Sequence, residues 1–381
     1  MIELLEKYFG WLVHAEGVIF IVLGIVLIAF KVPKTADYTP YRVSKNLLAA
    51  SLWTTSINVI IWIMLMNDDW TTQSPRIACM DIIFYYILGV TFSFAITNLL
   101  DKKCITRKRC QTTAITWTAT TIVCLLSQVE GLKEYQDWFL TAGLLGLLEF
   151  WVRALLYFRK TYARSGDIFD NYFSDDKRHF ISWIKRSFYL LYGSAVVAIL
   201  TINTGIIANW ALIVYIICTM MYVSISFINY AREYAELAKA DVQPEDKEEQ
   251  QPEREMESDS NSAPVKKILP SNLADKLSPV IQQWVDGKYY LTEQFSIDDL
   301  ANKLGTNKYY LSTYIRENYE MNFSTWIASL RIEEAKRLMQ EAPEMRLEAV
   351  AYAVGFSSLS YFSKVFSRLE GSSPSIWLRN R

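Results

Sequence analysis

Apolar residues dominate the first 230 positions of the chain, in runs long enough to form membrane-spanning helices. A helix needs about 20 apolar residues to cross the roughly 30 Å hydrocarbon core of a bilayer. Seven stretches reach or approach this length: Trp11–Phe30, Asn46–Met66, Ile77–Leu99, Thr112–Val129, Trp138–Phe158, Ser187–Asn203 and Trp210–Asn229. The fourth carries six threonines but no charge. The pattern predicts a bundle of seven transmembrane helices over residues 1–230.

Basic residues are distributed unevenly among the loops between these stretches. The six successive loops contain 4, 1, 5, 1, 7 and 0 lysines and arginines. Cytoplasmic loops of membrane proteins carry the basic excess. The alternation therefore predicts a multi-pass protein of a prokaryotic inner membrane, with the N-terminus outside and the C-terminus in the cytoplasm. The N-terminal segment lacks a small-residue cleavage site, so we expect no cleaved signal peptide.

A polar segment separates this apolar half from the rest of the chain. Residues 228–240 continue the seventh stretch with a helical pattern. Residues 240–264 contain nine acidic and two basic residues and almost no aromatic or β-branched ones. Such a composition cannot bury a hydrophobic core. Residues 231–264 are therefore interpreted as a helical extension followed by an acidic, disordered linker.

From residue 265 the pattern becomes that of a globular helical domain. Ser296 followed by Asp299 is a capping-box pattern for a helix start. Gly305 allows a tight turn after this first helix, and Asn307 can cap a second one. The apolar positions of the two helices are Leu300, Ala301, Leu304, Leu311 and Ile315. Two short helices joined by a turn that contains glycine predict a helix-turn-helix unit.

The same pattern recurs about 50 residues later. Gly355 and Phe356 form the second turn, and Ser357 is the expected cap of the following helix. The apolar positions are Leu347, Val350, Ala351, Val354, Phe362 and Phe366. Residues 324–341 between the units predict one long helix, which spans about 27 Å at 1.5 Å per residue. Successive major-groove faces on one side of a duplex are about 34 Å apart. The linking helix could therefore present the second helix of each unit, called the reading helix below, to adjacent grooves. The predicted fold is all-α throughout.

These motifs resemble the DNA-binding domain of the AraC/XylS family of transcription regulators. The second unit, AVAYAVGFSSLSYFSKVFSRLEGSSPSIWLR at 349–379, follows the family pattern almost throughout. The first unit and the linking helix match over residues 300–339, including Arg-Ile-x-x-Ala at 331–335. The resemblance covers about 100 residues, and we recognise no family for the membrane half.

The resemblance implies sequence-specific binding of promoter DNA by both second helices. The implied contact residues are Asn307, Lys308, Tyr309, Tyr310, Ser312, Thr313 and Arg316 in the first unit, and Ser357, Ser358, Leu359, Ser360, Tyr361, Lys364 and Arg368 in the second. The chain departs from the family at Thr313, where arginine is frequent, and at Leu359, which is often polar. It also departs at Glu320, where glycine is frequent, and this predicts a differently shaped turn.

Charge limits the expected strength of DNA binding. The formal net charge of the chain is −1. Residues 279–381 contain 12 basic and 12 acidic residues. Any attraction to phosphate must come from the local field of the reading helices, so binding should be modest and salt-sensitive. We find no sequence motif of an enzyme, a metal site or a cofactor site, and expect neither enzymatic activity nor a cofactor.

Ionisable residues inside predicted spans are costly and are candidate functional sites. His14, Glu16 and Asp81 lie near the outer ends of their helices, and Glu149 and Arg153 lie mid-helix with i, i+4 spacing. One interpretation is a ligand pocket that opens outward. The simpler one is that the outer groups reach water and that the Glu–Arg pair neutralises itself.

These observations predict a membrane-embedded one-component transcription regulator controlled by an unknown ligand or membrane partner. A second copy of the chain and RNA polymerase are further candidate partners. One alternative keeps DNA binding but makes the membrane half a passive anchor, with release by proteolysis. The other is a membrane receptor or transporter-like protein whose C-terminal helices bind a protein.

Overall fold

The computed structural model describes residues 2–66, 74–174, 178–201, 206–240, 271–292 and 295–380. These residues are helical, apart from loops and one isolated antiparallel bridge between Phe173 and Ser296. The chain divides into two compact units. Unit 1 comprises Met1–Ser165 and Phe180–Glu236, and unit 2 comprises Gly166–His179 and Leu237–Arg381. The predicted acidic linker lies outside the described residues.

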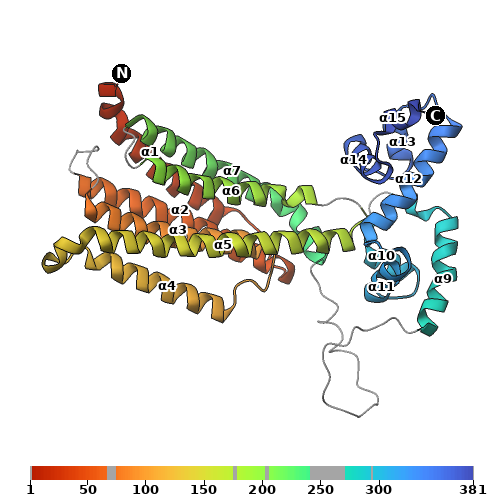
Figure 1. The fold of residues 1–381 in the computed structure, drawn as a ribbon, viewed down its shortest axis with the longest axis horizontal. Coiled ribbons are helices and arrows are strands. Elements are labelled where there is room, and N and C mark those ends of the chain that lie inside the picture. The colour runs from red at the N-terminus through yellow and green to blue at the C-terminus, as the bar shows by residue number, and fades with distance from the viewer. Residues whose placement is uncertain are drawn as a thin grey trace, which may run out of the picture. The chain divides into compact units, whose positions relative to one another are not determined.

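A helix forms at each of the seven apolar stretches. These helices are α1 (Ile2–Ala29), α2 (Thr39–Met66), α3 (Pro75–Asn98), α4 (Arg107–Leu126), α5 (Gln136–Tyr172), α6 (Arg178–Thr201) and α7 (Ile206–Ala240) (Figure 1). Two 3₁₀ turns, η1 (Ala36–Tyr38) and η2 (Glu130–Tyr135), precede α2 and α5. The helix α7 continues to Ala240, which confirms the helical extension predicted from the sequence.

Five of these helices are long and apolar enough to cross a membrane, rather than the seven predicted. Among the described residues the candidate spans are Tyr8–Ala29, Ala36–Leu65, Pro75–Asn98, Glu130–Tyr172 and Ile207–Tyr234. Helix α4 is absent from this set because its threonines and its basic first turn lower its mean hydropathy. The sixth predicted stretch, Ser187–Asn203, extends outside the described residues.

Unit 2 contains the predicted helix-turn-helix pairs. Its helices are α9 (Ser271–Asp286), α10 (Ile297–Lys303), α11 (Lys308–Tyr319), α12 (Phe323–Glu341), α13 (Leu347–Ala353), α14 (Leu359–Glu370) and α15 (Pro374–Arg379), with a 3₁₀ turn, η3 (Tyr289–Leu291), after α9. Figure 1 shows α12 running between the pair α10–α11 and the pair α13–α14. The linking helix is therefore confirmed, one residue longer than predicted at its N-terminal end.

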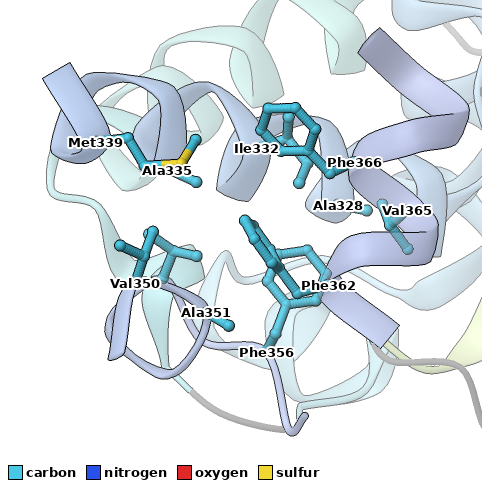
Figure 2. Packing of buried hydrophobic residues seen from close by; sticks show 11 residues of the cluster. Ala328, Ile332, Ala335, Met339, Val350, Ala351, Phe356, Phe362, Val365 and Phe366 are labelled. Carbon is cyan, nitrogen blue, oxygen red and sulfur yellow. The ribbon is translucent and has the colours of Figure 1, made fainter. Parts of the chain in front are cut away.

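Helix α12 is shared by two hydrophobic cores. Its first half buries Phe323, Trp326 and Ile327, and the Trp326 ring stacks on Trp284 of α9 with the ring centroids 5.9 Å apart. From Ala328 onward its buried residues Ala328, Ile332, Ala335 and Met339 belong to the core of the second pair (Figure 2). That core consists of Ala328, Ile332, Ala335, Met339, Val350, Ala351, Val354, Phe356, Phe362, Val365 and Phe366. Because one rigid helix enters both cores, the two pairs are held in a fixed relation.

The turn after α11 contains a residue in a strained conformation. Glu320 has φ of +53° and ψ of +28°, the left-handed region that glycine adopts freely. The sequence led us to expect a different turn because glycine is missing. That expectation is wrong, since Glu320 occupies the left-handed position and its N–H donates to the Arg316 carbonyl at 3.1 Å.

Replacing Glu320 by glycine is expected to stabilise unit 2. A non-glycine residue in the left-handed region costs about 1–2 kcal/mol, part of which the greater freedom of unfolded glycine offsets. We expect a gain of about 1 kcal/mol, measured as slower amide exchange of α11 and α12 in the full-length protein. Glu320→Ala is the matched control, because it removes the side chain and keeps the strain. A gain of equal size in Glu320→Ala would show that the carboxylate, not the backbone, is the destabilising group.

Candidate nucleic-acid interface

The two helix-turn-helix pairs have the same dimensions. Helices α10 and α13 each have seven residues, and α11 and α14 each have twelve. Gly305 and Gly355 have φ of +66° and +86° in the two turns. Asn307 caps α11, and its side chain accepts a hydrogen bond from the Tyr310 N–H at 2.9 Å. The chain thus presents two copies of the arrangement in which the second helix enters a major groove.

The cap of α14 differs from the prediction by one residue. Ser358, not Ser357, has the extended N-cap conformation, and its hydroxyl accepts a hydrogen bond from the Tyr361 N–H at 3.2 Å. Ser357 is exposed in the turn before it. The hydroxyl of Ser358 is therefore engaged with the backbone, while Ser357 is exposed.

Helix α14 has one polar, exposed face. Ser360, Lys364 and Arg368 are exposed and follow one another at i, i+4 spacing, so they lie on one side of the helix. Leu359 and Tyr361 are only half-buried and pack against the core of the second pair. The face suited to phosphate and base edges consists of the first three residues, with Leu359 and Tyr361 at its border.

Helix α11 presents a less basic face. Arg316 is exposed, whereas Lys308, Tyr309, Tyr310, Ser312 and Thr313 are half-buried. The Tyr309 and Tyr310 rings contact each other with centroids 5.6 Å apart. Thr313 lies at the position equivalent to Lys364, counted from the two caps. The structure therefore places one exposed base on α11 and two on α14.

Ion pairs with bases of α12 and of the turn before η3 neutralise several acidic residues of unit 2, including Glu370 at the end of α14. Lys336 pairs with Glu333 at 2.8 Å and with Glu370 at 3.0 Å, and Lys288 pairs with Glu334 at 2.8 Å. Arg337 pairs with Glu334 at 2.6 Å, and this contact helps to lower the pKa of that carboxyl. Arg316 and Arg368 make no ion pair within the described part of the chain. Equal numbers of acids and bases are thus compatible with a local positive field at the reading helices.

Unit 2 also contains the end of α5, which contacts the first pair. The Tyr172 hydroxyl donates to the Asp298 carboxylate at 3.0 Å. The Ser174 N–H donates to the Phe295 carbonyl at 3.0 Å, and the Phe295 N–H donates to the Ser174 hydroxyl at 3.1 Å. The Lys308 ammonium lies 5.6 Å from the centre of the Tyr172 ring. Lys308, one of the predicted DNA-contact residues, therefore lies next to the last residue of α5.

The candidate ionisable residues of unit 1 have different partners in the structure. Glu16 is buried in α1, and Asp81 accepts a hydrogen bond from the Asn58 amide at 3.0 Å. The hydroxyl of Tyr85 lies in the electrostatic field of both carboxylates. His14 is exposed and contacts the Gly10 carbonyl of its own helix. Sequence reasoning missed Asn58, although a lone amide within an apolar run is a signal that could have identified it.

The contacts of Glu149 and Arg153 join three helices. Arg153 pairs with Glu149 at 3.3 Å on α5 and donates to the Thr116 hydroxyl of α4 at 3.1 Å. Tyr86 of α3 contacts the same hydroxyl at 2.6 Å. Tyr85 and Tyr86 are neighbours on α3, so they point to different sides of that helix. The structure brings Glu149 and Arg153 together, as the spacing predicted, whereas Asp81 contacts Asn58.

Comparison with known proteins identifies the C-terminal region. Residues 300–380 match a family model described as a helix-turn-helix domain. The uncharacterised HTH-type transcriptional regulator YobQ of Bacillus subtilis is 33% identical over 88 residues, which are 23% of this chain and 36% of that protein. The probable transcription factor PqrA of Proteus vulgaris is 25% identical over 108 residues, 28% of this chain and 88% of that protein.

A further relative is also named as a regulatory protein. The Msm operon regulatory protein of Streptococcus mutans is 30% identical over 79 residues, which are 21% of this chain and 28% of that protein. No solved structure matches the chain. The names of these relatives describe transcription regulators and not enzymes. Together with the paired geometry of α10–α11 and α13–α14, they show that residues 300–380 form a helix-turn-helix domain similar to those of transcription regulators.

Proposed function

We propose that the chain is a membrane-embedded transcription regulator that binds promoter DNA through both helix-turn-helix units. The observation that carries this proposal is the exposed face of Ser360, Lys364 and Arg368 on α14, together with Arg316 on α11. One rigid helix, α12, joins both reading helices. The same chain contains five helices of membrane-spanning length and composition.

The proposed placement follows the basic loops. All seven helices α1 to α7 span the inner membrane of a prokaryote, with the N-terminus outside and the DNA-binding domain in the cytoplasm. The two helices that hydropathy alone does not identify, α4 and α6, are included because the alternation of basic loops requires them. Residues 1–230, 231–264 and 265–381 then serve as the membrane domain, the tether and the DNA-binding domain.

Control by a signal in the membrane domain is the second part of the proposal. Support comes from α5, whose final residues are part of unit 2 and contact α10 and α11 through Tyr172. A change in α5 could thereby alter the position of Lys308. An unknown ligand, a second copy of the chain and RNA polymerase are the partners that such a regulator would use.

Removal of the exposed bases of α14 tests DNA binding. Lys364→Ala and Arg368→Ala, each in the full-length protein reconstituted in nanodiscs, are expected to weaken binding to DNA from around its own gene about fivefold at moderate salt. Each should also lower the slope of log affinity against log salt by about one, because each removes one phosphate contact. Affinity is measured by fluorescence anisotropy over a salt series, with scrambled DNA as competitor.

Arg337→Ala is the matched control for these variants. Arg337 is also a half-exposed base, but it pairs with Glu334 and Glu341 on α12. Its loss should leave the salt slope unchanged. If wild-type protein binds native and scrambled DNA equally weakly at every salt concentration, the DNA-binding proposal fails, and a protein-binding role of the C-terminal helices takes its place.

A further inference from the structure

Helix α5 has two faces of different character within its apolar stretch. Its inner face packs into a core with α3 and α4, where Leu147, Phe150 and Ala154 are buried. Its outer face is uncovered. Leu145, Leu148, Val152 and Leu156 are 60%, 50%, 48% and 60% exposed and line an open groove.

The outer face also carries a charge pair. Glu149 and Arg153 line the same groove, with 53% and 37% of their side chains exposed. Glu149 lies next to the middle of the predicted span Trp138–Phe158. A charged residue at the centre of a bilayer is costly, and such residues almost always face protein or water. Hydrocarbon chains cannot supply partners for the uncovered parts of this pair.

The exposed face of α1 shows how a lipid-facing surface of this protein differs. Val18, Val22 and Ile25 are 60%, 51% and 55% exposed and carry no charge. Acyl chains cover such a surface at no electrostatic cost. The outer face of α5 combines the same kind of apolar residues with two opposite charges, so it is suited to a protein surface that also carries opposite charges.

We propose that the outer face of α5 is the interface between two copies of this chain in the membrane. Leu145, Leu148, Val152 and Leu156 follow the three-and-four spacing of helices that cross at a small angle. In a parallel pair related by a two-fold axis along the membrane normal, equal residues face each other. Glu149 and Arg153 are four residues apart, about 6 Å along the helix, so each carboxylate can reach the guanidinium of the other copy.

This arrangement makes the charges self-complementary. The pair of each copy has no net charge, and the carboxylate of each copy lies diagonally opposite the guanidinium of the other. Arg153 keeps its hydrogen bond to Thr116 of its own chain, which fixes the guanidinium at the edge of the groove. The dimer would bring two DNA-binding domains, and hence four reading helices, to one promoter. The inference rests on the proposed membrane placement of α5 and not on DNA binding.

Disulfide cross-linking in native membranes tests the interface. Leu148→Cys and Val152→Cys are introduced separately into full-length protein in which the exposed Cys110 and Cys218 are serine. Mild oxidation should convert both variants to a covalent dimer. Val22→Cys on α1 is the matched control, and should cross-link about tenfold less because a lipid-facing surface approaches a second copy only by collision. Yields at 148 and 152 no higher than at 22 overturn the proposal.

Opposite charge reversals in two differently tagged copies show whether the charges act between two chains or within one chain. In the Val152→Cys background, Glu149→Arg alone and Arg153→Glu alone should each reduce cross-linking about tenfold, because all four charges at the interface then have the same sign. Co-expression of the two variants should restore cross-linking between differently tagged chains but not between identical ones. If the mixed pair is not restored although both variants are present in the membrane, the charges do not meet across an interface and the proposal is wrong.

Membrane fractionation of the same samples keeps the two proposals distinct. Recovery of the chain in the soluble fraction would contradict the proposed membrane placement. Recovery in the membrane fraction without specific cross-linking would contradict the dimer interface alone.

Discussion

Replacing Arg331 by methionine is expected to destabilise unit 2 by about 3 kcal/mol, because charged hydrogen bonds contribute about 1.5–3 kcal/mol each and two would be lost. Arg331 is fully buried in α12. Its Nε donates to the Tyr290 carbonyl at 2.9 Å and its Nη2 to the Thr292 carbonyl at 2.8 Å. Methionine fills much of the volume but leaves both carbonyls without these donors.

The Arg331 side chain also lies close to aromatic rings next to both helix-turn-helix pairs. Its guanidinium lies 5.9 Å from the centre of the Phe295 ring, before the first pair, and 5.7 Å from that of Phe356, in the turn of the second. The side chain thus connects both helix-turn-helix pairs with η3. We therefore expect Arg331→Met to reduce specific DNA binding even at temperatures where the domain remains folded, because the two reading helices lose their fixed relation.

Hydrogen exchange measured by mass spectrometry on the full-length protein tests this prediction. A loss of about 3 kcal/mol corresponds to exchange of the α12 amides about a hundredfold faster. Arg337→Met on the same helix is the control, since ion pairs of exposed side chains contribute little to stability. If the α12 amides exchange as slowly in Arg331→Met as in the control, the free-energy cost of desolvating the buried guanidinium equals the stabilisation from its hydrogen bonds.

The helix-turn-helix pairs could be predicted from sequence because their determinants are local. The capping box of Ser296 and Asp299, the left-handed glycines and the apolar spacing each lie within a few residues of one another. The error at Ser357 is of the same local kind. Two adjacent serines can both cap a helix, and only the three-dimensional course of the turn decides which one does.

Contacts between distant segments could not be predicted. Nothing near Tyr172 in the sequence indicates that its hydroxyl meets Asp298, 126 positions away. In the membrane half most helices carry apolar residues on both buried and exposed faces, so periodicity does not reveal which face is buried. The spacing of Glu149 and Arg153 predicted their pairing, but not that Asp81 would meet Asn58 or that the Glu–Arg pair would lie on an uncovered face.

Replacing Gly355 by alanine is expected to destabilise unit 2 by about 3 kcal/mol, combining about 1–2 kcal/mol for a positive φ with about 1–3 kcal/mol for forced overpacking. Gly355 has φ of +86°. A Cβ atom there would lie 2.6 Å from the Leu291 carbonyl oxygen and 3.1 Å from the Arg331 Nε. The first of these neighbours is backbone and cannot rotate away, so the turn itself must move.

Alanine variants at two other glycines separate the free-energy cost of the positive φ from that of the steric contact. Gly305 and Gly371 have φ of +66° and +73°, and a Cβ atom at either would meet nothing within 4 Å. Their alanine variants should lose only about 1–2 kcal/mol, the cost of the left-handed backbone. The comparison uses amide exchange of α12 to α14 in all three variants. If Gly355→Ala costs no more than the other two, the close approach of η3 to the second turn does not hold the pairs together, and the shared helix α12 must do so alone.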